Sequence, residues 1–217
     1  RNSDYTIREY ICNFIMSKLE TNTIDTISGS TTLTLGGTNA NTINVSGTLQ
    51  NNGSAFAQGI TEADMWRLSA GISISSATTT TLGSNWERVD DATFSKIGTG
   101  MTESSGIFTF PSTGIYQIIL SIGVYTNSQA AEEYFKTEIL GTSNNSSYVD
   151  LTQSSQQIAD IATYDYARGY TSTFFDVTDT STHKVKFAVF FETRSATVAG
   201  KSTETISGVQ FIRLGDT

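Results

Sequence analysis

Eight runs of residues with strand character follow one another between residues 86 and 214, and no long helical pattern separates them. Residues 184–191, KVKFAVFF, alternate most plainly, whereas residues 115–122, IYQIILSI, are apolar on both faces. A strand that is apolar on both faces belongs inside a sandwich or at a subunit interface. Clusters of Gly, Asn and Asp separate the runs, as expected of turns. The pattern predicts an all-β, antiparallel two-sheet sandwich of the jelly-roll type.

The composition favours the same fold class. The 217 residues include 35 Thr, 27 Ser and 20 Ile, against 10 Leu. β-branched side chains fit a pleated strand and lose rotamer freedom on a helix, so a mostly helical fold is excluded. The net charge of −8 argues against nucleic-acid binding, and no apolar run is long enough for membrane insertion. One Cys and one His cannot form a Cys- or His-based metal site, and we expect no metal and no cofactor.

Residues 5–19 have the spacing of an amphipathic helix, with Ile7, Ile11 and Phe14 on one broad apolar face. A helix of about four turns is marginally stable alone and needs a partner. That partner is either copies of the same helix or a docking surface elsewhere. The alternative is that the helix packs on the chain's own domain. We predict that residues 1–20 anchor or oligomerise the chain.

Residues 21–60 are nearly all Thr, Ser, Asn and Gly with single apolar residues between them, and Asn-Thr-Ile at residues 22–24 recurs at residues 41–43. Strands with so few apolar residues cannot build a core within one chain, so neighbouring chains would have to supply it. A disordered linker is the alternative. We predict a β-stalk and connector over residues 21–83, with a short helix or turn around Trp66 that separates the stalk from the last domain, and a head over residues 84–217.

Three segments of the head form a recognisable set: FSKIG at residues 94–98, SGIFTFPSTGIY at residues 105–116 and GVQFIRL at residues 208–214. Together they resemble the core signature of complement one-q and tumour-necrosis-factor-like heads. In that signature a Gly–aromatic–Thr strand leads through a Pro-x-x-Gly turn to a Tyr that opens the central strand. The sequence segments around Trp66 and Trp86 resemble more closely those in the heads of structural proteins of marine phages and related viruses.

The resemblance implies a ten-stranded jelly roll that trimerises about a threefold axis. The chain departs from vertebrate complement-type heads because it lacks a collagen-like stalk, and no acidic set clearly matches their calcium site, so metal binding is not carried over. We place seven side chains at the interface between subunits: Ile7, Ile11, Phe14, Tyr116, Ile118, Phe190 and Phe211.

The segment TYDYARGY at residues 163–170 has the composition of a recognition loop. Tyr164, Tyr166, Arg168 and Tyr170 combine a large contact area with directed hydrogen bonds. We predict that this loop either binds a receptor or packs between subunits.

The sequence offers little catalytic chemistry. His183 lies in a polar turn without a nucleophile elbow, and residues 199–203, AGKST, lack the first Gly and the following helix of a phosphate-binding loop. In a strand, the adjacent acids of Asp90-Asp91 and Glu132-Glu133 point to opposite faces, so neither pair alone forms a glycosidase site. A pair assembled across the fold or between subunits stays open. We predict no enzymatic activity.

These patterns predict a homotrimeric, non-enzymatic fibre or decoration protein on the extracellular surface of a virion. Its N-terminal region would bind other virion proteins, and its head would attach to a host-surface receptor or glycan. Three weak sites on one axis would act together by avidity. Two alternatives are a secreted or cell-surface adhesin or ligand with the same head, and a polysaccharide depolymerase tailspike.

Overall fold

The computed structural model divides the chain into two compact units, Arg1–Phe56 and Ala57–Thr217. In the first unit it describes a short hairpin, in which β1 (Gln50–Asn51) pairs antiparallel with β2 (Ser54–Ala55). The predicted helix with Ile7, Ile11 and Phe14, and the predicted stalk up to residue 49, lie outside the described residues. The described residues of the whole chain are 50–51, 54–55, 59–126, 132–159 and 164–217.

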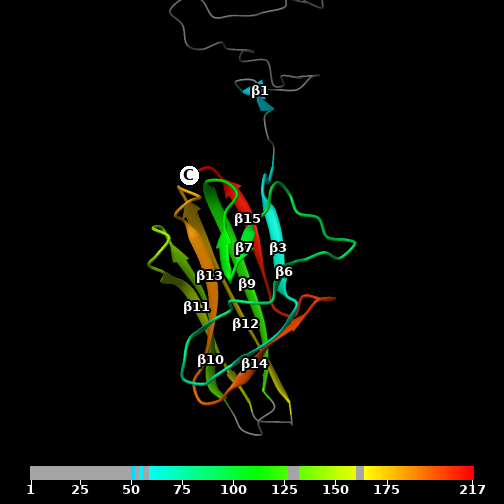
Figure 1. Cartoon of the computed structure of the whole chain (residues 1–217), viewed down its shortest axis with the longest axis vertical. Helices are drawn as coiled ribbons and strands as arrows, with labels where there is room; N and C mark the ends of the chain where they lie inside the picture. Colours follow the sequence, from blue (N-terminus) through cyan, green and yellow to red (C-terminus); the bar gives the residue numbers. More distant parts are fainter. Residues whose placement is uncertain (1–49, 52–53, 56–58, 127–131, 160–163) are drawn as a thin grey trace, which may run out of the picture. The chain divides into compact units, whose positions relative to one another are not determined.

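The second unit is a sandwich of two antiparallel sheets (Figure 1). One has seven strands in the order β4-β14-β9-β15-β3-β6, with β12 paired to the other edge of β9. The second has six strands in the order β11-β10-β13-β8-β7, with β5 paired to β13. The described residues contain no helix, which confirms the predicted all-β antiparallel sandwich. The strands are β3 (Ala63–Leu68), β4 (Ala70–Ile74), β5 (Thr80–Thr81), β6 (Trp86–Arg88), β7 (Thr102–Ser104), β8 (Ile107–Thr109), β9 (Gly114–Thr126), β10 (Glu132–Thr142), β11 (Val149–Ile158), β12 (Asp165–Val177), β13 (Lys184–Phe191), β14 (Ala196–Lys201) and β15 (Gly208–Gly215).

An aromatic cluster centred on Phe108 joins the two sheets. The rings of Trp66, Trp86, Phe187 and Phe211 have their centroids 5.3–5.5 Å from that of Phe108. These side chains come from β3, β6, β13 and β15, so both sheets contribute to one core. Aromatic pairs at such separations stabilise a core beyond the area that they bury.

Three of the side chains that we placed between subunits lie in this core instead. Tyr116, Ile118 and Phe211 are at most 1% exposed, so they pack within one chain and present no surface to another copy. The physical reason is that β9 is apolar on both faces, and the sequence does not say which face meets the second sheet. The remaining one, Phe190, is half-buried on β13 and has its ring 5.8 Å from that of Tyr134.

The sandwich begins before the predicted boundary at residue 84. β3 pairs with both β15 and β6, so Trp66 lies in a strand of the sheet and the helix or turn expected around it is wrong. The Asp64 carboxylate accepts hydrogen bonds from Trp66 Nε1 at 2.9 Å and from the backbone N–H of Met101 at 2.8 Å. Because Met101 is distant in sequence, this contact ties β3 to the segment before β7.

The turn predicted at Pro111 is confirmed between β8 and β9. Gly114 at its end has φ +140°, and a Cβ there would lie 2.5 Å from the carbonyl oxygen of Gly215, so only glycine fits. The Tyr116 hydroxyl lies 2.9 Å from Ser112 Oγ and donates to the Ser112 carbonyl at 3.1 Å, which ties the turn to the central strand.

Candidate binding face

The segment predicted as a Tyr-rich loop is a strand. β12 pairs with β9 over its whole length, and alternate residues of β12 point away from the core. Tyr166, Tyr170 and Phe174 are 74%, 56% and 65% exposed, and Arg168 is exposed among them. The spacing of Tyr-x-Arg-x-Tyr by two was already visible in the sequence, and this period is the signal that indicates a strand. Tyr164 precedes the strand and is also exposed.

The exposed side chains of β12 continue onto the neighbouring strands. Ile115 of β9 is opposite Asp176 of β12 and Gly215 of β15, and Leu214 of β15 is exposed nearby. We call Tyr170, Phe174, Ile115 and Leu214 together the aromatic face. A hollow of about 540 Å³ lies near the carboxy-terminal ends of β12 and β15, and we call it the C-terminal hollow. It is lined by Ile115, Phe174, Asp176, Leu214 and Gly215.

A second pocket lies at the opposite end of the same sheet, where β14 and β15 separate. Both strands pair with one edge of β9: β14 at Val124 and Tyr125, and β15 from Ser121 onwards. Between them, Ser207 Oγ accepts a hydrogen bond from the Gly123 N–H at 3.0 Å and donates to the Gly123 carbonyl at 3.2 Å. The backbone is therefore satisfied although the sheet opens. This fork pocket has a volume of about 600 Å³ and is lined by Gly71, Gly123, Val124, Tyr125, Tyr166, Ala167, Arg168, Ala199, Gly200 and Ile206.

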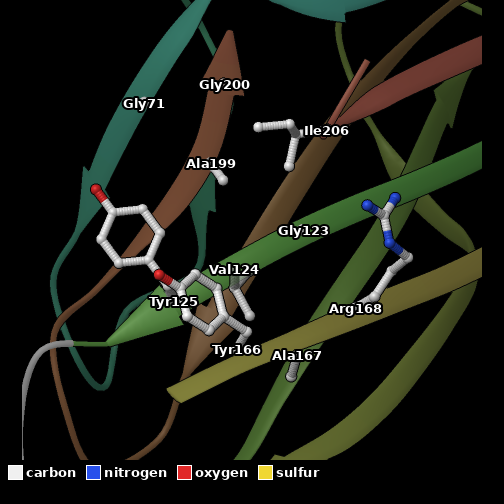
Figure 2. Close-up of a pocket in the computed structure, with 10 residues that line it drawn as sticks. All are labelled: Gly71, Gly123, Val124, Tyr125, Tyr166, Ala167, Arg168, Ala199, Gly200 and Ile206. Carbon is white, nitrogen blue, oxygen red and sulfur yellow. The ribbon is translucent and has the colours of Figure 1, made fainter. Parts of the chain in front are cut away.

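Figure 2 shows two tyrosine rings grouped on one side of the fork pocket and the Arg168 guanidinium on the other, with β9 between them. The rings of Tyr125 and Tyr166 have their centroids 6.0 Å apart. Arg168 Nη1 donates to Ser121 Oγ at 2.7 Å, and none of the ion pairs among the described residues includes Arg168. The pocket thus combines aromatic surface with one cation that retains free hydrogen-bond donors.

The other candidate groups have structural partners. Arg67 is fully buried, and its guanidinium lies 2.7 Å from Glu87, 2.5 Å from Asp90 and 3.0 Å from Asp91. Asp90 and Asp91, the acidic pair considered for a glycosidase site, therefore bind a buried arginine at the β3–β6 edge of the sheet.

His183 has its Nδ1 3.0 Å from the carbonyl oxygen of Asp179, within the turn before β13. Lys201 ends β14 and pairs with Glu204 at 2.6 Å, so the AGKST segment belongs to a strand and its turn. The side chains of Glu132 and Glu133 lie outside the described residues.

Within the described ranges, no three His, Cys, Asp or Glu side chains gather as a metal site would require. The same residues include no helix with the length and apolar character needed to cross a membrane.

Comparisons with known proteins identify the fold. No model of a known protein family matches the sequence, and neither does any curated protein. Among solved structures, Eiger TNF from S. frugiperda superposes with a TM-score of 0.52 at 12% identity, over 71% of this chain and 93% of that one. Murine APRIL has a TM-score of 0.49 at 11% identity, over 70% and 98%. The vertex protein P5 of PRD1 has a TM-score of 0.44 at 16% identity, over 73% and 100%. The likeness to Eiger TNF shows that the sandwich has the TNF-like jelly-roll fold expected from the sequence.

Proposed function

We propose that this chain is a homotrimeric, non-enzymatic attachment protein, a fibre or decoration protein on the surface of a virion. One observation carries the proposal: the aromatic face leaves large apolar side chains of β9, β12 and β15 exposed on one side of a fully packed sandwich. Large apolar side chains exposed together on one face of a sheet mark an interaction site.

The aromatic face suits contact between copies of the same chain. Tyr170, Phe174 and Leu214 have no role in the core. Phe174 and Leu214 also line the C-terminal hollow, which offers a recess into which a neighbouring side chain would fit. A ring of three copies requires a head-to-tail interface that closes after three steps, in which each chain offers two complementary patches. The sequence resemblance to heads that trimerise favours three copies over other numbers.

The attachment role follows from multivalency. Three heads on one axis bind a surface far more tightly than one head does, because the second and third contacts form at high effective concentration. The expected N-terminal helix and stalk would join the trimer to other virion proteins. The placement on a virion is supported by the resemblance of the segments around Trp66 and Trp86 to phage structural proteins.

A secreted adhesin or ligand with the same head is the second candidate, because Eiger TNF has the same fold. A depolymerase is less well supported, since the adjacent acids Asp90 and Asp91 both bind Arg67. Mass spectrometry of purified virions separates the first two, because a cellular adhesin would be missing from the particles.

Light scattering of the purified full chain tests the trimer. We expect a mass three times the chain mass of 23.4 kDa, independent of concentration in the micromolar range. A stable monomer would overturn the proposal.

A further inference from the structure

We propose that the fork pocket binds an acidic saccharide, with the Arg168 guanidinium holding its carboxylate and the rings of Tyr125 and Tyr166 stacking on its sugar rings. This inference names the class of ligand for attachment and therefore rests on the proposed function. The pocket lies at the end of the sheet opposite the carboxy-terminus, away from the residues that lead into β3.

Arg168 supplies the charge. Its guanidinium has five N–H donors, and the described structure uses Nη1 for one hydrogen bond, to Ser121 Oγ. That bond fixes the orientation of the planar group and leaves donors for a carboxylate, which guanidinium groups bind through two parallel hydrogen bonds. Arg168 is also the charged residue among the ten that line the pocket, so no lining acid competes for it.

Gly123 supplies the space in front of this cation. It is opposite Arg168 in the β9–β12 pairing, so a side chain at either position would project to the same side of the sheet. A Cβ on Gly123 would lie 2.9 Å from Ile206 Cγ2 and 3.7 Å from Arg168 Nη2. Any larger side chain would therefore fill the room beside the guanidinium. The two hydrogen bonds between Ser207 Oγ and the backbone of Gly123 keep that backbone paired at this open point, so the hollow is built into the fold.

The two tyrosines supply the surface for a sugar. A pyranose ring has apolar C–H faces and a polar rim, which match an aromatic face with a hydroxyl at its edge. Tyr125 and Tyr166 form one wall of the pocket, and their interplanar angle of 40° gives it two differently inclined surfaces. Pockets that combine aromatic walls with a few convergent polar groups are typical of small-ligand sites.

The charge of the chain favours a singly acidic sugar over a polyanion. With a net charge of −8, a long anionic chain would be repelled outside the pocket, whereas one carboxylate at Arg168 would meet a local cation. Charges more than about 8 Å away are largely screened at physiological ionic strength, so the local cation decides.

The charge of Arg168 also indicates that this end of the sheet is not the contact between copies. Three unneutralised Arg168 side chains brought together on a threefold axis would repel one another. Phe174 is six residues further along β12, about 20 Å away. The subunit contact and the saccharide site therefore occupy different ends of the strand.

Isothermal titration of the purified full chain with an otherwise neutral oligosaccharide that carries one uronic acid residue tests the inference. We expect this uronate to bind, and to bind at least about tenfold more weakly after its carboxylate is reduced to an alcohol, because a charged hydrogen-bonded pair is lost. Arg168→Gln should weaken binding by a similar factor, and so should Tyr166→Ala, whose exposed side chain is not needed for folding. Lys96→Gln removes the same charge far from the pocket and should bind like the wild type.

Several outcomes would overturn the saccharide site. They are equal binding of the reduced oligomer, no binding of any uronate, and a preference for a sulfated but carboxylate-free glycan. Light scattering of Arg168→Gln completes the test. A variant mass that differs from that of the wild type would place Arg168 between subunits and refute the saccharide site, while the wild-type trimer would remain. A monomeric wild type that still binds the uronate would refute the trimer and leave the saccharide site.

Discussion

The outer faces of the two sheets cover their aromatic side chains differently. On the six-stranded sheet, Lys136 Nζ lies 5.6 Å from the ring centre of Tyr134 and 5.3 Å from that of Phe190. Lys186 Nζ lies 4.4 Å from the ring centre of Tyr148. A lysine that lies over a ring shields it with its methylene stem and keeps its ammonium group in water. The lysines therefore cover the aromatic rings of this face and present charged groups to solvent.

The aromatic face of the seven-stranded sheet has no such cover among the described residues, whose cation–π contacts include none of its members. Tyr170 and Phe174 are exposed although they stand on a long, fully paired strand. The aromatic face is therefore the one that the proposed contact between copies would cover.

The largest effect is expected from Phe174→Ser on the aromatic face. Each copy would lose the burial of one Phe side chain, worth about 1.5–3 kcal/mol, and a trimer would lose it three times. We expect the variant to be monomeric at micromolar concentration by light scattering, with an unchanged far-ultraviolet circular dichroism spectrum.

Val149→Ser is the matched control for this change, because Val149 is an equally exposed apolar residue on β11 of the other sheet. It should leave the mass unchanged. A trimeric Phe174→Ser, or loss of the trimer in both variants, would remove the distinction between the two faces.

The next effect concerns the β3–β6 edge of the seven-stranded sheet, where Arg67 binds three carboxylates. Arg67→Ala should lower the free energy of unfolding by about 2 kcal/mol, less than the 3–5 kcal/mol typical of a broken buried pair, because its carboxylate partners are partly exposed and regain water. Lys201→Ala, which breaks a solvent-exposed pair with Glu204, should cost less than about 0.5 kcal/mol. Urea titration at one fixed protein concentration measures both. Equal costs would mean that the buried network adds nothing.

The sandwich was predictable from the sequence because local patterns determine it. Alternating apolar residues in 184–191 and the Pro111 turn follow from the geometry of strands and turns, which needs no knowledge of distant contacts. The orientation of β9 was not predictable in this way. Its residues are apolar on both sides, so the choice of Tyr116 over Ile115 as a core residue depends on which side meets the second sheet.

The candidate site was predicted in composition but not in geometry. The sequence indicated that Tyr166, Arg168 and Tyr170 belong together, and its period of two was present but was outweighed by the loop-like composition. The fork pocket could not be foreseen, since it depends on where β14 and β15 separate and on the tertiary hydrogen bonds between Ser207 and Gly123. Such contacts between distant residues leave no local pattern.

A smaller effect is expected on the six-stranded sheet from Lys136→Ala. The change removes the cover from two aromatic rings, and we expect it to lower the free energy of unfolding by about 0.5–1 kcal/mol. Lys136→Met keeps the apolar stem without the charge and should recover part of the loss. Thermal unfolding at low and high salt measures both variants, and an unchanged stability for Lys136→Ala would show that this face does not need its lysines.

The smallest effect concerns the one buried acid of the same face. Glu138 on β10 is 5% exposed, and loss of water on burial, together with repulsion from Asp150, raises its pKa, while Lys136 acts in the opposite direction. In the unfolded chain a Glu side chain titrates near about 4.3. The folded chain therefore binds more protons between that pH and the raised pKa, so the contribution of Glu138 to stability is complete below pH of about 4 and is lost as the pH rises through the raised pKa.

Glu138→Gln removes this dependence. The variant should match the wild type in acid and should be more stable by a fraction of a kcal/mol at neutral pH, because a neutral amide avoids the cost of a buried charge. Urea titrations of both proteins from pH 3.5 to 8 measure the difference. An advantage for the variant that shrinks as the pH rises would have the wrong sign, and would mean that Lys136 stabilises the carboxylate more than burial disfavours it.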